Sequence, residues 1–185
     1  MPTLDEVAKK YSATIVRKRG LDIISVPVEC DGQIDIGFFR TERKSLGKVL
    51  PFLAREEFSP DLYTYGGQTE SWLSLFGADE ELCHALRTLL DGCATSIEWS
   101  GSRATARVSI LRGSPDGDST GGERFFANLA MIANRLETIY VIGRSNDMPQ
   151  NAGSLGPAKV RKIMLTSIFI GTFSFLMAVH YAFRR

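Results

Sequence analysis

The residues from Ile163 to Phe183 form the segment that most constrains how this chain can fold. These 21 residues include no Asp, Glu, Lys or Arg, and ten of them are Ile, Leu, Phe or Val. As a helix rising about 1.5 Å per residue, the segment would be about 31 Å long, which matches the hydrocarbon core of a bilayer. Buried helices of soluble domains are usually shorter, so the sequence predicts a single membrane-spanning helix.

The composition of this segment also predicts how it would contact lipid. Large apolar side chains would hold it in the bilayer, namely Ile163, Phe169, Phe173, Leu176 and Phe183. Basic residues flank the span and would lie at the lipid headgroups: Lys159, Arg161, Lys162, Arg184 and Arg185. Because three basic residues precede the span and two follow it, their count hardly decides its orientation.

Four small residues fall on one face of the predicted span. They are spaced 4, 3 and 4 apart, at Ser167, Gly171, Ser174 and Ala178. Small side chains let membrane helices approach closely, so this face is a hypothetical site of self-association. Small residues are also common in spans that do not pair, and the sequence leaves both alternatives open.

The remainder of the chain has the composition of a soluble domain. Of all 185 residues, 44% are hydrophobic and 23% are charged, within the usual range for globular proteins. We expect a domain over residues 1–143, a flexible linker rich in Asn, Gly, Ser and Pro over 144–158, and the anchor with its basic flanks over 159–185. The first twenty residues have no apolar stretch typical of an export signal, so the domain is expected on the cytoplasmic side.

Charge and cysteine content exclude several classes of function. The net charge of the whole chain is +1. Residues 159–185 carry five basic residues and no acid, a charge of +5, so the rest of the chain carries −4. Such a domain lacks the basic surface expected of a nucleic-acid-binding protein. Cys30, Cys83 and Cys93 are odd in number and lack the spacing of a zinc site, which favours a reducing compartment and no bound metal or cofactor.

Hydrophobic periodicity predicts both helices and strands in the domain. Helices are expected at residues 3–11, 45–58 with a kink at Pro51, 69–77, 79–92 and 124–143. Strands are expected at 13–18, 21–29, 33–42, 61–65, 94–101 and 103–113, with a hairpin turn at Asp31-Gly32. Because strands and helices do not alternate regularly, the pattern predicts an α+β fold: an antiparallel or mixed sheet built from hairpins, with helices packed on it.

Two groups of polar residues are candidates for a site. His84 is the only histidine before the predicted span, so a histidine-dependent mechanism in the domain would have to use it. The basic groups at 17–19 and 40–44 would form one patch if their strands paired, and such a patch could contact anionic lipid. A solvated rim is the alternative for these basic residues.

The function expected from the sequence is a tail-anchored module that binds, scaffolds or regulates another protein at a membrane. One alternative is a membrane-held enzyme with a site near His84, and another is a membrane effector that oligomerises through the span. The expected location is the inner membrane in a bacterium, or the mitochondrial outer membrane or another tail-anchor target in a eukaryote. The expected partners are the lipid bilayer, another protein and a second copy of the span, but no nucleic acid.

Overall fold

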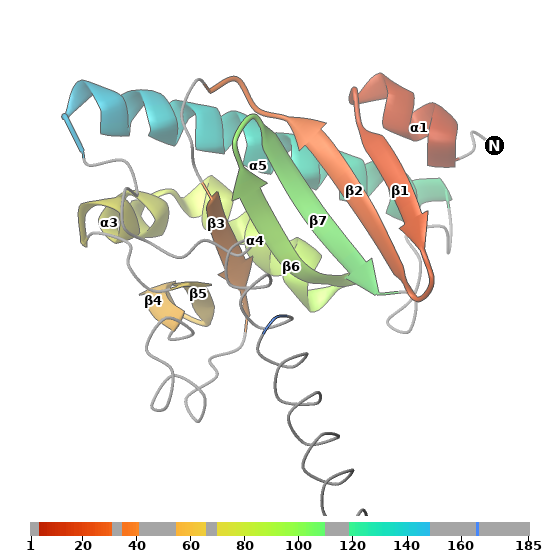
Figure 1. Ribbon diagram of the computed structural model, residues 1–185, viewed down its shortest axis with the longest axis horizontal. Helices are drawn as coiled ribbons and strands as arrows, with labels where there is room; N and C mark the ends of the chain where they lie inside the picture. The colour runs from red at the N-terminus through yellow and green to blue at the C-terminus, as the bar shows by residue number, and fades with distance from the viewer. Residues whose placement is uncertain are drawn as a thin grey trace, which may run out of the picture.

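A computed structural model describes residues 4–30, 35–40, 55–65, 70–109, 119–148 and 166. Its centre is a seven-stranded sheet in the order β1-β2-β7-β6-β3-β5-β4 (Figure 1). All six neighbouring pairs are antiparallel. The predicted α+β class is therefore confirmed, and the sheet is antiparallel rather than mixed.

The elements follow one another along the chain with short connections inside each hairpin. The strands are β1 (Thr14–Lys18), β2 (Leu21–Pro27), β3 (Asp35–Phe39), β4 (Arg55–Ser59), β5 (Leu62–Tyr65), β6 (Ala94–Ser100) and β7 (Arg103–Ser109). The described helices are α1 (Leu4–Lys10), α3 (Glu70–Ala78), α4 (Glu80–Asp91) and α5 (Ser119–Ser145).

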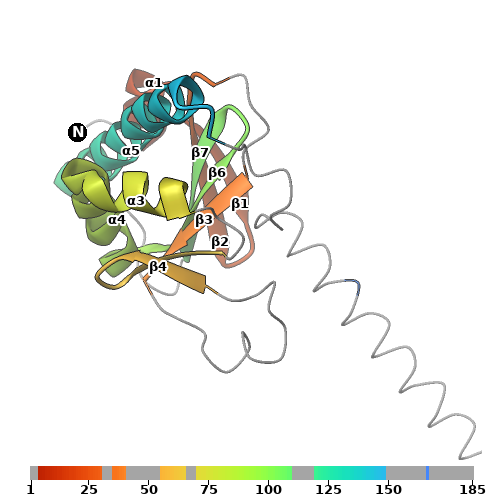
Figure 2. The same cartoon turned by 90° about the vertical axis from the view of Figure 1, so that its left-hand side faces the viewer.

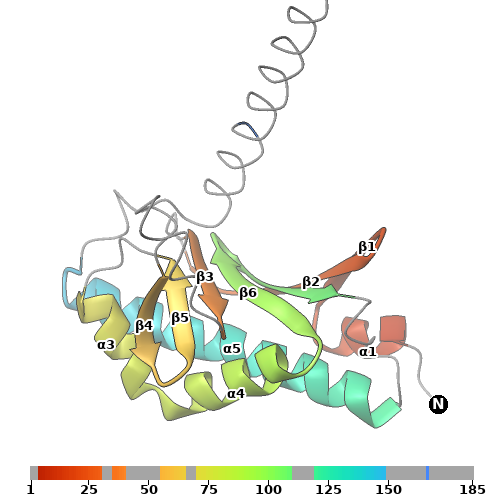
Figure 3. The ribbon, with the colours of Figure 1, turned by 90° about the horizontal axis from the view of Figure 1, so that it is seen from below.

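These four helices cover one face of the sheet (Figures 2 and 3). The core lies between the two layers. A row of fully buried side chains crosses four strands in register, from Ile24 through Ala106 and Ile97 to Phe38. Because side chains alternate along a strand, the next row, Ser25, Thr105 and Glu98, lies on the face away from the helices.

Helices α4 and α5 were predicted correctly. On α4, the Asp79 carboxylate accepts a hydrogen bond of 2.9 Å from the Leu82 N–H and so caps the helix start. The leucines of α4 form a stripe that is buried throughout, namely Leu82, Leu86, Leu89 and Leu90. The long helix expected at 124–143 is α5, which begins five residues earlier and ends two residues later.

The hairpin expected at Asp31-Gly32 was wrong. β2 and β3 are consecutive in sequence, but β7 and β6 lie between them in the sheet. A turn signal indicates that the chain reverses and does not say which strands pair. Here all seven residues of β2 pair with β7, which puts Ile24 opposite Ala106 in the core. The hairpins of this sheet include β1–β2 and β6–β7, which turn at Gly20 (φ +74°) and Gly101 (φ +54°).

The helix expected over 45–58 was wrong in its last part. Arg55–Ser59 is β4, which pairs with β5. The Phe58 ring packs edge-on against Phe38 at 5.9 Å and Phe76 at 5.8 Å between centroids, so burial between sheet and helix overrides local propensity. Residues 45–54 lie outside the described residues.

The tail predictions lie almost wholly outside the described residues. Among the helices of the described ranges, none is both long and apolar enough to cross a membrane. Of the predicted span at 163–183, the structure describes only Thr166. The predicted anchor, packing and headgroup residues named above are all outside the described part.

Candidate protein-binding surface

The outward side of α5 carries a row of exposed, uncharged residues. The opposite side of the helix is buried in the core through Phe126, Leu129, Ile132, Leu136 and Ile139. The exposed row, here called the α5 seam, consists of Ala127, Met131, Asn134, Thr138, Val141 and Ser145. Its spacing of 4, 3, 4, 3 and 4 residues is that of the contact positions in a helix that pairs with another helix.

Exposed large hydrophobic residues in the described ranges gather on α5, two of them within the α5 seam. Only four large hydrophobic residues are exposed in those ranges: Val16 (51%), Met131 (40%), Val141 (64%) and Ile142 (39%). Val16 lies on the edge strand β1, and the other three lie on α5. Single exposed hydrophobic residues are ordinary, but a concentration on one helix face is typical of an interaction surface.

An open groove of about 560 Å³ lies beside the C-terminal end of the α5 seam. Its wall is mostly apolar, and its lining comes from α5 and from the segment that follows β2: Glu29, Cys30, Tyr140, Val141, Arg144 and Ser145. Val141 and Ser145 therefore belong to both the groove and the seam. The groove widens the contact area that a partner could use.

The segment on the far side of the groove is held in place by hydrogen bonds. The Glu29 N–H donates to the Glu137 carboxylate of α5 at 2.6 Å, and the Cys30 thiol donates to the Gly101 carbonyl at 2.9 Å. The Trp99 indole N–H donates to the same carbonyl at 3.1 Å. These bonds tie Glu29 to α5 and Cys30 to the turn between β6 and β7.

Charged residues flank the seam without entering it. Glu137 and Arg144 lie along one side, and Arg135 lies along the other. Arg135 forms ion pairs with Asp79 at 2.6 Å and Glu81 at 3.4 Å, so it ties α5 to the start of α4. An apolar and uncharged centre with a charged rim is the usual composition of a protein interface.

His84 does not contribute to this surface. It is exposed on α4 and is not among the residues that line the groove. Its neighbour Cys83 is buried, and the Cys83 thiol donates to the Phe76 carbonyl at 3.3 Å. Burial raises the pKa of the Cys93 thiol above its usual value, which disfavours the nucleophilic thiolate. In the described ranges, no three His, Cys, Asp or Glu residues gather as a metal-binding group.

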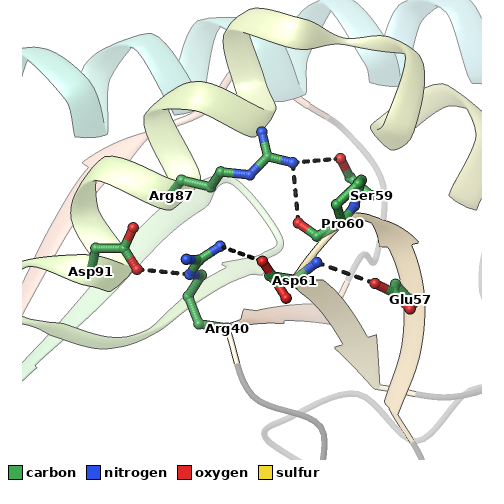
Figure 4. Close-up of polar contacts among 7 residues, drawn as sticks. All are labelled: Arg40, Glu57, Ser59, Pro60, Asp61, Arg87 and Asp91. Atoms are coloured by element: carbon green, nitrogen blue, oxygen red, sulfur yellow. Dashed lines mark hydrogen bonds and ion pairs between the residues drawn. The ribbon is translucent and has the colours of Figure 1, made fainter.

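Of the two basic groups expected to share one patch, the structure describes residues 17–19 and Arg40, and these lie apart in the sheet. Three strands lie between β1, which carries Arg17, and β3, which is followed by Arg40. Arg40 forms an ion pair of 2.7 Å with Asp91 of α4 and a longer one of 3.7 Å with Asp61 (Figure 4). Together with Arg87, which donates to the Ser59 hydroxyl at 2.8 Å, Arg40 fastens the β4–β5 hairpin to α4.

A buried ion pair lies on the helix-free face and was not anticipated from the sequence. The Glu98 carboxylate accepts from Arg107 Nε at 2.9 Å, and Glu98 is only 6% exposed. Burial raises the pKa of Glu98 above its usual value, although Arg107 and a hydrogen bond from Ser96 act in the opposite direction. Alternation along β6 and β7 could have placed both residues on one face, but register was needed to bring them together.

Comparison with known proteins identifies no related protein. No protein-family model matches the chain, and neither curated proteins nor solved structures contain a match. The candidate surface therefore rests on the geometry of α5 and of the groove beside it.

Proposed function

We propose that this chain is a membrane-held module whose domain binds a protein partner through the α5 seam. The observation that carries the proposal is the row of six exposed residues at helix-pairing spacing, uncharged throughout, on a helix that spans the sheet. Surface helices in water normally present charged residues outward. An outward face without charge is therefore better suited to contact with another protein than to permanent solvation.

Attachment to a membrane is proposed from the charge-free segment at 163–183. The α5 helix ends at Ser145, so residues 146–158 separate it from the basic flank that begins at Lys159. A flexible segment of that length has a typical end-to-end distance of about 20 Å. The α5 seam would then work within a short distance of the bilayer, and its partners would be proteins at the same membrane. We place the domain on the cytoplasmic side.

Membrane attachment is tested by placing charges in the span. The combined change Phe169→Arg and Phe173→Arg adds a cost of about 2.5–3.5 kcal/mol per residue at the bilayer centre. We expect the variant to move from the membrane pellet to the soluble fraction. The matched control is Arg17→Glu and Lys18→Glu, which changes exposed charges on β1 and should leave the protein in the pellet. Retention of the Phe169→Arg, Phe173→Arg variant in carbonate-washed membranes would contradict the proposed span.

Binding is tested by placing a charge in the α5 seam. Val141→Glu introduces a carboxylate at the most exposed hydrophobic residue of the described ranges, and Val16→Glu does the same on β1. We expect Val141→Glu to remove the proteins that are crosslinked to the wild-type chain in membranes, and Val16→Glu to retain them. Equal loss in both variants would indicate a surface other than α5.

A further inference from the structure

We infer that the α5 seam binds a second copy of this chain, as an antiparallel pair of α5 helices. This inference rests on the proposed function and names its partner. The seam is uncharged, so two identical seams can meet without placing like charges together. A two-fold symmetric pair requires such a self-complementary patch, because each residue of the patch meets the same patch on the other copy.

The rim charges select one register for this pair. When Thr138 of one copy lies opposite Val141 of the other, Asn134 lies opposite Ser145, and the symmetric contacts repeat on the other side of the axis. In this register Glu137 lies beside Arg144 of the second copy, because both occupy the same side of the seam. Each pair of copies then contains two such contacts between opposite charges.

Other arrangements do not bring these charges together. An antiparallel pair shifted by one heptad puts Met131 opposite Val141 and places Glu137 of both copies side by side. A parallel pair puts Glu137 beside Ile142 and Ala130 beside Arg135. Only the register with Thr138 opposite Val141 has an uncharged centre and opposite charges on its rim.

A hydrogen bond holds one of these rim charges in place. Glu29 follows β2, lines the groove and donates its backbone N–H to the Glu137 carboxylate at 2.6 Å. The Glu137 carboxylate lies on the side of the α5 seam that Arg144 of a second copy would reach. The contact would extend over about three turns of helix, from Asn134 to Ser145, which is a small interface. Attachment of both copies to one membrane would raise their local concentration and favour such a weak contact.

Disulfide formation between copies tests the register. Two differently tagged full-length chains, one with Thr138→Cys and one with Val141→Cys, are reconstituted together into lipid vesicles and oxidised briefly. We expect the mixed disulfide to form at least about fivefold faster than the disulfide between two copies of the Thr138→Cys chain. The unmodified chain, with its three native cysteines, gives the background. A Thr138→Cys homodimer that forms faster than the mixed species would overturn the antiparallel register.

Charge reversal tests the rim contact independently. Glu137→Arg and Arg144→Glu should each reduce the mixed disulfide by about tenfold, because each reversal creates two like-charge contacts. Combining both reversals should restore its formation, since opposite charges face one another again. The bond from the Glu29 N–H to residue 137 is lost in Glu137→Arg and in the combined variant alike, so it cannot explain a recovery of the combined variant over Glu137→Arg. No recovery in the combined variant would overturn the inference.

These results are distinguishable from failure of the proposed function. The vesicles contain no other protein, so pairing there concerns the second copy alone. If the chain does not pair in vesicles but Val141→Glu still removes a different crosslinked protein in cell membranes, the α5 seam binds that protein and only the second-copy inference fails. If neither is observed, both fail.

Discussion

Asp79 and Arg135 form an ion pair of 2.6 Å that joins the start of α4 to the middle of α5. Asp79 is 6% exposed at its side chain and also accepts the 2.9 Å capping bond from the Leu82 N–H. One carboxylate therefore both begins α4 and fixes its position against the helix that carries the α5 seam. Removal of this residue should affect the stability of the domain more than removal of an exposed acid.

We predict that Asp79→Ala lowers the free energy of unfolding by about 1–3 kcal/mol. The cap contributes about 1 kcal/mol, and the lost charge-assisted bond to Arg135 adds the rest; this part is reduced because Arg135 is 35% exposed and keeps its 3.4 Å pair with Glu81. Asp79→Asn retains a capping oxygen and should cost less than Asp79→Ala. Urea unfolding followed by circular dichroism measures both. The control is Asp5→Ala, whose longer 3.4 Å pair with Arg17 is exposed and should change stability by less than about 0.5 kcal/mol. Equal effects at both positions would contradict this role.

Gly143→Ala should destabilise the domain although alanine favours helices. A Cβ at this position would lie 2.6 Å from Cη2 of Trp72, a buried side chain that packs edge-on against Trp99. The gain of about 1 kcal/mol in helix propensity should be outweighed by an overpacking cost of about 1–3 kcal/mol. Thermal unfolding should show a lower Tm for Gly143→Ala, while Ser145→Ala, on the exposed face of the same helix, should leave Tm nearly unchanged. A higher Tm for Gly143→Ala would show that Trp72 moves away freely.

Thr64→Val should stabilise the domain. Thr64 is fully buried, and within the described ranges its hydroxyl has no hydrogen-bonding partner. Replacing the hydroxyl by a methyl group of similar size removes a desolvation cost of about 1 kcal/mol. Thr105→Val is the comparison. The Thr105 hydroxyl shares a 3.0 Å hydrogen bond with Ser25, so its loss should destabilise the domain. The prediction fails if the two valine variants shift the urea midpoint in the same direction.

Glu98 should make stability depend on pH in the acidic range. Burial raises the pKa of Glu98 in the folded state above its usual value, so the folded state binds this proton more tightly than the unfolded state. The contribution of Glu98 is therefore most favourable below its unfolded pKa and is lost as pH rises through the folded pKa. The unfolding free energy of the wild-type chain, minus that of Glu98→Gln, should decrease over this window. A difference that increases with pH would mean that Arg107 outweighs burial.

The sequence predicted those features that depend on local periodicity. The leucine stripe of α4 and the alternating alanines of β7 each identify their own buried face, so α4 and the β6–β7 hairpin were expected where they occur. The pairing of β2 with β7 could not be found in this way, because it depends on which apolar faces match over seven residues. For the same reason the packing of Phe58 against Phe38 and Phe76 was missed, and with it strand β4.

The candidate site was not found from the sequence because the feature that marks it is the lack of charged residues in one row of α5. Asn134, Thr138 and Ser145 are unremarkable in a helix, and the periodicity that identifies α5 comes from its buried residues. That periodicity also indicates the outward side, but a row of uncharged residues from Ala127 to Ser145 matches no motif that would mark it as a site. His84 was proposed as a candidate only because histidine often takes part in catalysis. It is exposed on α4, outside the groove, and has no role in the proposed surface.

Site-specific photo-crosslinking at Val141 tests the central proposal most directly. A photoreactive amino acid is placed at Val141 or, as the matched control, at Val16 of the full-length chain in its native membrane. We predict a protein adduct from Val141, absent or much weaker from Val16, that is lost when Thr138→Glu is added within the same seam. An adduct of the same intensity from both positions, or none from Val141, would contradict the assignment of the α5 seam as a binding surface.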